Sequence, residues 1–305
     1  MNSGILLVDK PQGITSHDVV ARMRRLVGTR KIGHAGTLDP MATGLLLLGA
    51  NGATRLLHHL VGLDKEYLAT VRLGWDTTTD DADGEPLAAA SADRVAAIAD
   101  DRLAHAMRTL TGVIEQVPSS VSAVKVDGRR AYQRVRAGEE VALKARTVTV
   151  PVFELIDRRS GEGWLDLDVR VECSSGTYVR ALARDLGAAL GVGGHLTALR
   201  RTRIGRFRVD EAGELEGYDV TSMMRPADAA RRALPALELD AGAAVDLGHG
   251  KRVAAPESVL GVDGPIAAIA PGDRLVAIVE RRGPQLKVVT GFPPDDDGRP
   301  ARGDA

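Results

Sequence analysis

One stretch of the chain, residues 31–49, combines residue types that could perform chemistry. It reads KIGHAGTLDPMATGLLLLG, and Asp39 is its single acid, placed just before an apolar run. Pro40 pushes the backbone of Asp39 toward an extended conformation, and Gly33 and Gly36 permit a tight loop. The carboxylate should therefore project from a fixed turn at the edge of a core strand. Such a group is either a structural cap or a catalytic nucleophile, and the spacing alone favours the cap.

Other reactive groups in the sequence fit structural roles better than catalytic ones. Ser16, His17 and Asp18 are consecutive, which suits the start of a helix rather than a catalytic triad. His58 and His59 are adjacent, so they cannot share one helix face as metal ligands. We therefore expect neither a triad nor a metal site at these positions.

Composition and hydropathy exclude several classes of protein. The chain has 305 residues, a formal net charge of -1 and a single cysteine, Cys173, which rules out an internal disulfide and a cysteine-rich zinc site. No run approaches the roughly 18 apolar residues of a membrane span, and the N-terminus lacks the pattern of a signal peptide. No phosphate-loop or dinucleotide-binding motif is present. We expect a soluble, cytoplasmic protein without a metal, nucleotide or redox cofactor.

Basic residues nevertheless gather in three clusters. They lie at 22–31, which includes Lys31, at 125–136, which includes Arg130, and at 200–208, which includes Arg201. Together the clusters could form one face that binds nucleic acid through its phosphates. Solvated helix faces with local ion pairs explain the same residues equally well.

The elements that must position Asp39 alternate between strands and helices. Strands are predicted at 4–10, 44–50, 65–74, 145–157, 164–173 and 204–210; 44–50 reads as a buried apolar strand, and 65–74 alternates polar and apolar residues. Helical periodicity predicts helices at 15–28, 53–62, 93–112 and 178–190. Thr15 and Asp18 make a capping-box pattern for the first helix, and Gly28 is expected to cap its C-terminus. Several strands are joined by short turns, so an α+β fold with a mixed sheet is expected.

Two regions depart from this alternation. Residues 75–90 are acidic and polar; they resemble part of a calcium loop, but Ala90 stands where its final glutamate belongs, so we expect solvated surface. From residue 241 the sequence breaks into short apolar stretches with glycine turns, at 244–255, 264–270, 273–283 and 285–292. This pattern predicts a small all-β barrel. The expected domains are therefore 1–240 and 241–292, with 293–305 as a disordered tail.

Five segments, in this order, resemble the bacterial tRNA pseudouridine-55 synthases of the TruB family: GILLVDKPQGITSHDVV, KIGHAGTLDPMATGLLLLG, DKEYLATVRLG, PSSVSAVKVDGRRAY and CSSGTYVRALARDLG. The resemblance covers roughly residues 4–210. It implies the pseudouridine synthase fold, with a mixed, largely antiparallel central sheet and flanking helices, followed by a reduced, PUA-like RNA-binding β-barrel. It also implies that one uridine in the T-arm of tRNA is converted to pseudouridine. That isomerisation needs no cofactor, and we expect a monomer without an obligate protein partner.

The resemblance gives three residues catalytic roles. Asp39 matches the family's nucleophilic aspartate; attack on C1′ and elimination to a glycal both remain open. Tyr67 in DKEYLA resembles the tyrosine that stacks on the target uracil and can move a proton. Arg180 in GTYVR resembles the arginine that keeps the catalytic aspartate ionised. By themselves, Tyr67 would be read as a half-buried strand aromatic and Arg180 as an exposed helix arginine.

Further residues are implied to bind the substrate. His34 resembles a histidine that fills the place of the flipped base, Tyr178 one that packs under the base, and Leu199 an apolar residue of the uracil pocket. Alone, His34 would be surface and Leu199 core. The chain departs from the family at Ala35, where many relatives carry a hydroxyl, and at Ser175, where a basic residue often follows the serine.

Two other functions stay open at this stage. The same basic surface would suit an RNA chaperone that folds tRNA, with catalysis secondary. A subunit of a guide-RNA ribonucleoprotein is the third possibility. The combination of Asp39, Tyr67 and Arg180 favours an enzyme, and the amino-acid sequences of the motifs are closer to those of the stand-alone synthases.

Overall fold

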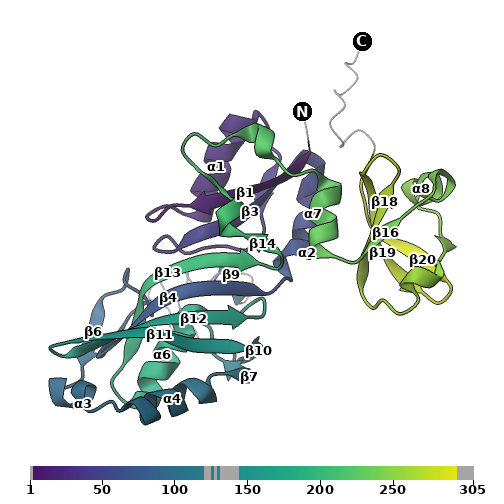
Figure 1. Cartoon of the computed structure of the whole chain (residues 1–305). Helices are drawn as coiled ribbons and strands as arrows, with labels where there is room; N and C mark the ends of the chain where they lie inside the picture. The colour runs from purple at the N-terminus through teal and green to yellow at the C-terminus, as the bar shows by residue number, and fades with distance from the viewer. Residues whose placement is uncertain (1–2, 120–124, 127–128, 131–143, 294–305) are drawn as a thin grey trace. The chain divides into compact units, whose positions relative to one another are not determined.

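The computed structural model of the chain describes residues 3–119, 125–126, 129–130 and 144–293. The chain divides into two compact units, each with helices and strands (Figure 1). Unit 1 consists of Met1–Pro40, Gly44–Leu63 and Ile204–Ala305. Unit 2 consists of Met41–Thr43 and Asp64–Arg203. The α+β class expected from the sequence is confirmed.

The N-terminal half of unit 1 is built on a buried strand pair. Its elements are β1 (Gly4–Lys10), α1 (Ser16–Val27), β2 (Ile32–His34), β3 (Thr43–Ala50), η1 (Asn51–Leu56) and α2 (Leu57–Val61). β3 pairs antiparallel with both β1 and β2. The run Leu45–Leu48 is fully buried, as expected for a strand covered on both faces. Val19 and Met23 of α1 pack into the same core cluster as Leu46 and Leu48.

Helix α1 begins and ends as its sequence predicts. The Thr15 hydroxyl accepts a hydrogen bond from Asp18 N, and the Asp18 carboxylate accepts one from Thr15 N at 2.8 Å, which completes a capping box. Gly28 adopts a left-handed conformation, with φ of 72°, and its N–H donates to Arg24 O. Both ends of the helix are therefore fixed by local bonds.

Unit 2 is a mostly antiparallel sheet with helices. Its strands are β4 (Lys65–Leu73), β5 (Trp75–Thr77), β6 (Pro86–Ala89), β7 (Gly112–Gln116), β8 (Lys125–Val126), β9 (Arg129–Arg130), β10 (Arg146–Val150), β11 (Val152–Gly161), β12 (Trp164–Cys173) and β13 (Gly194–Ile204). Its helices are α3 (Ala92–Ala96), α4 (Asp100–Thr109) and α6 (Val179–Leu190). The main strand order is β11-β12-β4-β13. Every second residue of β4 is buried, which matches the alternation in its sequence.

The remainder of unit 1 carries the C-terminal sheet. Its elements are β14 (Phe207–Arg208), η2 (Val209–Glu211), β15 (Gly213–Glu214), η3 (Val220–Ser222), α7 (Pro226–Ala233), β16 (Ala236–Glu238), α8 (Ala241–Gly248), β17 (Val253–Ala254), η4 (Glu257–Val259), β18 (Pro265–Ala270), β19 (Arg274–Arg282) and β20 (Gln285–Gly291). Five strands pair in the order β16-β18-β19-β20-β17 (Figure 1). Ile269, Leu275 and Phe292 share a core cluster with Ala230 of α7. The C-terminal part thus contains a five-stranded sheet, and α8 lies between β16 and β17 in the sequence. The division of the chain at residue 240 stays a prediction.

Three expectations about elements were wrong. The segment 244–255 was expected to be a strand, but its first part belongs to α8, because Asp240 caps the helix through Ala243 N and alanines favour helix. Of the strand expected at 204–210, only β14 at Phe207–Arg208 and the last residue of β13 are extended. The long strand β13 itself was not predicted, because its arginines hide the apolar alternation. The helix expected at 93–112 is two helices, α3 and α4, separated by three residues.

The acidic segment 75–90 also differs from the expectation of plain solvated surface. It contains the strand pair β5–β6, and Asp81 within it is buried. Leu196 N donates to Asp80 O at 3.1 Å, so the turn of this segment is bonded to β13. The segment is therefore part of the folded body of unit 2.

Candidate active site

The peptide that precedes Asp39 is held by the first turn of α1. Asp39 lies between β2 and β3, in a loop where Gly36 has φ of 93°. The Ser16 hydroxyl donates to Leu38 O at 3.1 Å and accepts from Leu38 N at 2.9 Å. Both residues are buried, so this pair of hydrogen bonds fixes the backbone one residue before the Asp39 carboxylate.

The peptide that follows Asp39 is held in the same way. Pro40 O accepts from Gly13 N at 2.8 Å and from Lys10 Nζ at 3.3 Å. Lys10 is completely buried, and its ammonium also donates to the carbonyls of Pro11 and Ile14. A buried cation surrounded by carbonyls remains where it is only if those carbonyls stay in place. The fixed turn that the sequence predicts around Asp39 is confirmed.

Unit 1 also contains two of the expected substrate-binding residues. His34 is at the end of β2 and is half-buried, and its ring lies 5.4 Å from that of His17, centroid to centroid, in a T-shaped arrangement. Lys31 is exposed and immediately precedes β2. Its carbonyl accepts from Asn51 N at 2.8 Å, so its backbone is anchored while its side chain faces solvent.

Unit 2 contains the expected base-contacting residues. Tyr67 is on β4 with 8% of its surface exposed, and Leu199 is on β13 with 7% exposed. Tyr178 is the N-cap residue of α6. Its N–H donates to Gln116 Oε1 at 2.8 Å, and Gln116 Nε2 donates back to its carbonyl at 3.1 Å. This pair of hydrogen bonds fixes the start of the helix that carries Arg180.

Arg180 is buried in an ion pair, not exposed on a helix surface. Its Nη1 lies 3.3 Å from Asp81 Oδ2, and only 5% of each side chain is exposed. The same nitrogen donates to Thr79 O at 2.8 Å and to the hydroxyl of Ser119 at 3.4 Å. The pairing of Arg180 with Asp39 stays a prediction, because the two residues belong to different units.

Sequence reasoning missed Asp81, although a signal for it exists. Arg180 and Arg184 are four residues apart on α6 and so lie on one face of that helix. Asp80 pairs with Arg184 at 3.2 Å, as Asp81 does with Arg180. Burial raises the pKa of Asp80, and Arg184 opposes that rise. Two adjacent acids therefore match two arginines one helical turn apart, a complementarity that the sequence contains.

A second cluster of buried polar residues includes Lys65, which lies two residues before Tyr67 on β4. Burial, followed by the charge of Arg201, lowers the pKa of the Lys65 ammonium to about 8. Burial raises the pKa of the Cys173 thiol to about 11. Arg201 has only 1% of its surface exposed. A direct phosphate contact by Arg201, expected from its basic cluster, does not fit this burial.

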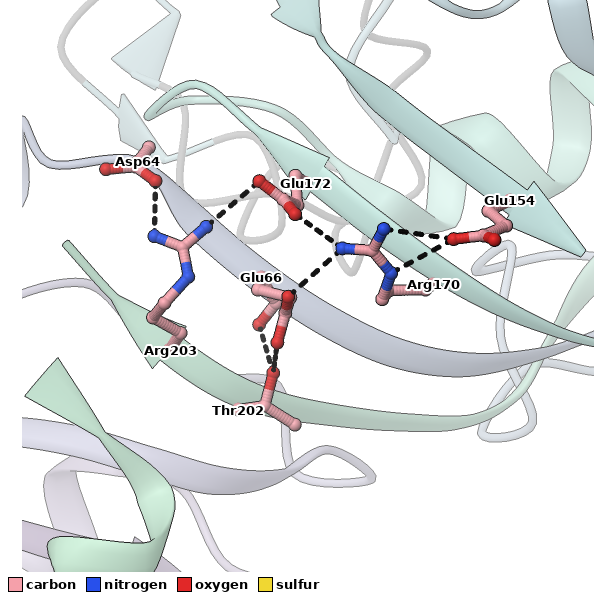
Figure 2. Close-up of polar contacts among 7 residues, drawn as sticks. All are labelled: Asp64, Glu66, Glu154, Arg170, Glu172, Thr202 and Arg203. Atoms are coloured by element: carbon pink, nitrogen blue, oxygen red, sulfur yellow. Dashed lines mark hydrogen bonds and ion pairs between the residues drawn. The ribbon is translucent and has the colours of Figure 1, made fainter. Parts of the chain in front are cut away.

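The cluster at 200–208 is partly neutralised by acids. Arg203 pairs with Asp64 and with Glu172, the latter at 3.2 Å, and the network continues to Arg170 with Glu66 and Glu154 (Figure 2). The seven residues of this network, which contains four carboxylates and two guanidiniums, are Asp64, Glu66, Glu154, Arg170, Glu172, Thr202 and Arg203. The ion-pair explanation therefore holds for this part of the cluster. The side chain of Arg130 and most of cluster 125–136 lie outside the described residues.

Comparison with protein families identifies the group to which this site belongs. The model described as "TruB family pseudouridylate synthase (N terminal domain)" matches residues 24–179, just over half of the chain. The chain belongs to the TruB family. The models described as "tRNA pseudouridylate synthase B C-terminal domain" and "tRNA Pseudouridine synthase II, C terminal" match residues 180–238 and 234–293 of this TruB chain. The resemblance seen in the sequence is confirmed.

Named relatives match the TruB chain along nearly its whole length. The tRNA pseudouridine synthase B of Leifsonia xyli subsp. xyli is 56% identical and covers 97% of this chain and 98% of the relative. That of Thermobifida fusca is 53% identical, with 96% and 99% covered. High identity over both lengths means that these proteins share one domain composition.

Solved structures match the TruB fold as well. A chain in the crystal structure of a Cbf5–Nop10–Gar1 complex has a TM-score of 0.72 and 27% identity, over 96% of this chain and 86% of that one. A chain in an H/ACA RNP bound to a substrate RNA containing 2′-deoxyuridine has a TM-score of 0.69, 26% identity and the same coverage. These matches support the pseudouridine synthase fold, with mixed sheets and helices.

Two kinds of feature are absent from the part of the TruB chain that the structure describes. No helix there is long and apolar enough to cross a membrane. No group of three or more His, Cys, Asp or Glu side chains there is arranged to hold a metal ion.

Proposed function

We propose that this TruB chain converts the uridine at position 55 in the T-arm of tRNA to pseudouridine. Membership of the family and the names of the relatives carry the enzyme class, an isomerase that acts on uridine in tRNA. The single observation in the structure that supports the chemistry is the clamped turn around Asp39. Backbone groups on both sides of this carboxylate are bonded to the segment Lys10–Ser16.

Asp39 is the proposed nucleophile. In the reaction, the bond between C1′ of the ribose and N1 of uracil breaks, the base rotates, and C5 bonds to C1′ in its place. The carboxylate either attacks C1′ or accepts the C2′ proton to give a glycal, and a fixed position beside the sugar favours both routes. Holding a reacting group in place avoids the entropy loss of orienting it during the reaction. In the first route the carboxylate leaves C1′ as C5 bonds to it, and in the second the proton returns to C2′. C5 then loses its proton to solvent and N1 takes one up, so the product is an isomer and no electrons are gained or lost.

Arg180 is proposed to keep Asp39 ionised. A guanidinium has five N–H donors in a rigid fork, so it can serve a second carboxylate while Nη1 is held by Asp81 and Thr79 O. Asp81 then acts as a positioning residue, because it fixes the guanidinium without touching substrate. Opposite charge nearby lowers a carboxyl pKa, which keeps the nucleophile competent near neutral pH.

The aromatic and apolar residues are proposed to receive the flipped base. Tyr67 offers a π-face for uracil and a hydroxyl that can move a proton, and Tyr178 and Leu199 complete the pocket. His34 fills the place that the base leaves, which offsets part of the few kcal/mol that flipping costs.

Binding of the tRNA backbone is proposed for basic side chains and for the C-terminal sheet. Lys31 and Arg130 supply phosphate contacts, and residues 241–292 form a PUA-like RNA-binding module. We further propose a cytoplasmic monomer without an obligate protein partner. The relatives' name, tRNA pseudouridine synthase B, mentions no partner, whereas one similar solved chain belongs to a complex with Nop10 and Gar1.

The proposed position can be tested with T-arm stem-loop RNA. The purified chain should release tritium from uridine labelled at C5. Mass spectrometry after chemical labelling of pseudouridine, which has the same mass as uridine, should locate one pseudouridine at position 55. An RNA with cytidine at that position and the other uridines retained is the control, and it should give no product. Product at another uridine of the control RNA would contradict the assigned position.

A further inference from the structure

Two histidine rings lie together beside the Asp39 turn. The rings of His17 and His34 have centroids 5.4 Å apart and planes inclined by 82°, so an edge of one faces the plane of the other. His17 is exposed on the first turn of α1, and His34 is half-buried at the end of β2. Edge-to-face aromatic pairs are attractive and limit ring rotation. The exposed ring therefore restrains the half-buried one.

The backbone that carries His17 is unusually well fixed for an exposed residue. His17 lies in the sequence between Thr15 and Asp18, which are bonded to each other in the capping box. Its neighbour Ser16 is bonded twice to the backbone of Leu38, next to Asp39. The first turn of α1 thus fixes the Asp39 loop through Ser16, and it contacts the ring of His34 through the adjacent residue His17.

We propose that His17 is a positioning residue that holds the His34 ring ready to replace the flipped uridine. This inference rests on the proposed function, in which His34 enters the gap that the base leaves. A ring that already has a restricted orientation loses less conformational entropy when it enters that gap. His17 acts on the flipping step through His34 and does not touch the reacting atoms.

The effect should appear in rate rather than in folding or affinity. His17 is exposed, so removal of its ring leaves no cavity in the core. The ring contact corresponds to about a three- to tenfold change in the population of the oriented His34 ring. His17→Ala should therefore lower the single-turnover rate on T-arm RNA about three- to tenfold, with little change in the affinity for RNA.

The chain contains a matched control pair in unit 1. His58 and His59 also form a T-shaped contact, with centroids 5.6 Å apart and planes at 77°, and again the first ring is exposed and the second is half-buried. This pair lies on α2, and no proposed role in the reaction involves it. His58→Ala should leave the single-turnover rate unchanged. It corrects for any general effect of deleting an exposed histidine ring.

The decisive experiment is a double-mutant cycle read in single-turnover reactions, with thermal melting of each variant. His17→Ala should lose about three- to tenfold in the wild-type background and almost nothing in the His34→Ala background. His17→Phe, which retains a flat ring, should recover most of the rate. A fluorescent base beside the target nucleotide should report slower flipping in His17→Ala.

The outcomes separate this inference from the proposed function. Equal losses from His17→Ala with and without His34, or no recovery in His17→Phe, would overturn the positioning role in an active enzyme. A loss equal to that of His58→Ala would do the same. Wild-type protein that makes no pseudouridine on T-arm RNA would overturn the proposed function and this inference with it.

Discussion

Replacing Asp81 by asparagine should destabilise unit 2 and slow the reaction. The change removes the negative partner of a guanidinium whose side chain is 5% exposed. Loss of one partner from a buried ion pair costs about 3–5 kcal/mol. Arg180 keeps its bond to Thr79 O, and the amide oxygen of the variant can still accept, so the lower end, about 3 kcal/mol, is expected. A loosened guanidinium also supports Asp39 less well, so the rate should fall with the stability.

Urea unfolding followed by tryptophan fluorescence measures this effect. The chain has two tryptophans, Trp75 and Trp164, and both are in unit 2. With a urea dependence of about 1–3 kcal/mol per molar, Asp81→Asn should lower the midpoint by about 1–3 M. Asp83→Asn, an exposed acid in the same segment, is the control and should shift it very little. Equal midpoints for the two variants would refute the argument that the Arg180 pair depends on Asp81.

Three further predictions concern titration and RNA binding. Burial lowers the pKa of Lys65 to about 8 from 10.5, so above pH 8 the unfolded state binds more protons and the free energy of unfolding should rise, by about 1 kcal/mol up to pH 9. Lys65→Met should remove that rise in the free energy of unfolding. The folded Cys173 thiol, with its pKa raised to about 11, keeps its proton above pH 9 and so opposes a further rise, which Cys173→Ala should therefore restore. Urea titrations at each pH would show both effects. Lys31→Ala should flatten the dependence of log affinity on log salt by about 0.7–0.9 in filter binding, while Arg203→Gln leaves the slope unchanged. Lys287 is exposed on β20, and Lys287→Glu should weaken tRNA affinity at low salt without changing the rate at saturating tRNA. An unaltered affinity would count against an RNA-binding role for the C-terminal sheet.

Deletion of the C-terminal sheet would be a poorer test than the single substitution at Lys287. Ile269, Leu275 and Phe292 belong to the same core cluster as Phe207 and Ala230 of the preceding segment. Removal of residues 241–305 would expose that cluster, so a lost affinity could reflect unfolding rather than a lost RNA contact. The single substitution avoids this ambiguity because Lys287 is exposed.

Features with local causes were predictable from the sequence. Helix α1 follows from its capping box, its helical periodicity and Gly28. Both caps are observed, and Val19, Val20 and Met23 are buried. Strand β12 has the predicted bounds, because its alternation is clear and glycine precedes it. The turn at Asp39 follows from Pro40 and the glycines before it. For the helix and the strand, residues within a few positions determine the backbone, whereas the turn at Asp39 is also held by Lys10, Gly13 and Ser16.

Features that depend on distant partners could not be predicted from any single segment of the sequence. Asp81 looks like a solvated acid in its own segment, and only Arg180, 99 positions later, makes it a buried ion-pair partner. Arg201 and Arg203 look alike in the sequence, yet one is buried near Lys65 and the other is paired with Asp64 and Glu172. Burial and pairing of charges arise from the register of β4, β12 and β13, which no local pattern specifies.

The nucleophilic role of Asp39 is the central claim, and substitution by asparagine tests it most directly. Asp39→Asn keeps the shape of the side chain but removes its charge, so T-arm RNA should still bind. Asp157→Asn, an exposed acid on β11, is the matched control and should react like the wild type. We predict that tritium release from uridine labelled at C5 falls to background for Asp39→Asn while RNA affinity stays within a few-fold. Tritium release by Asp39→Asn at the rate of Asp157→Asn would contradict the account.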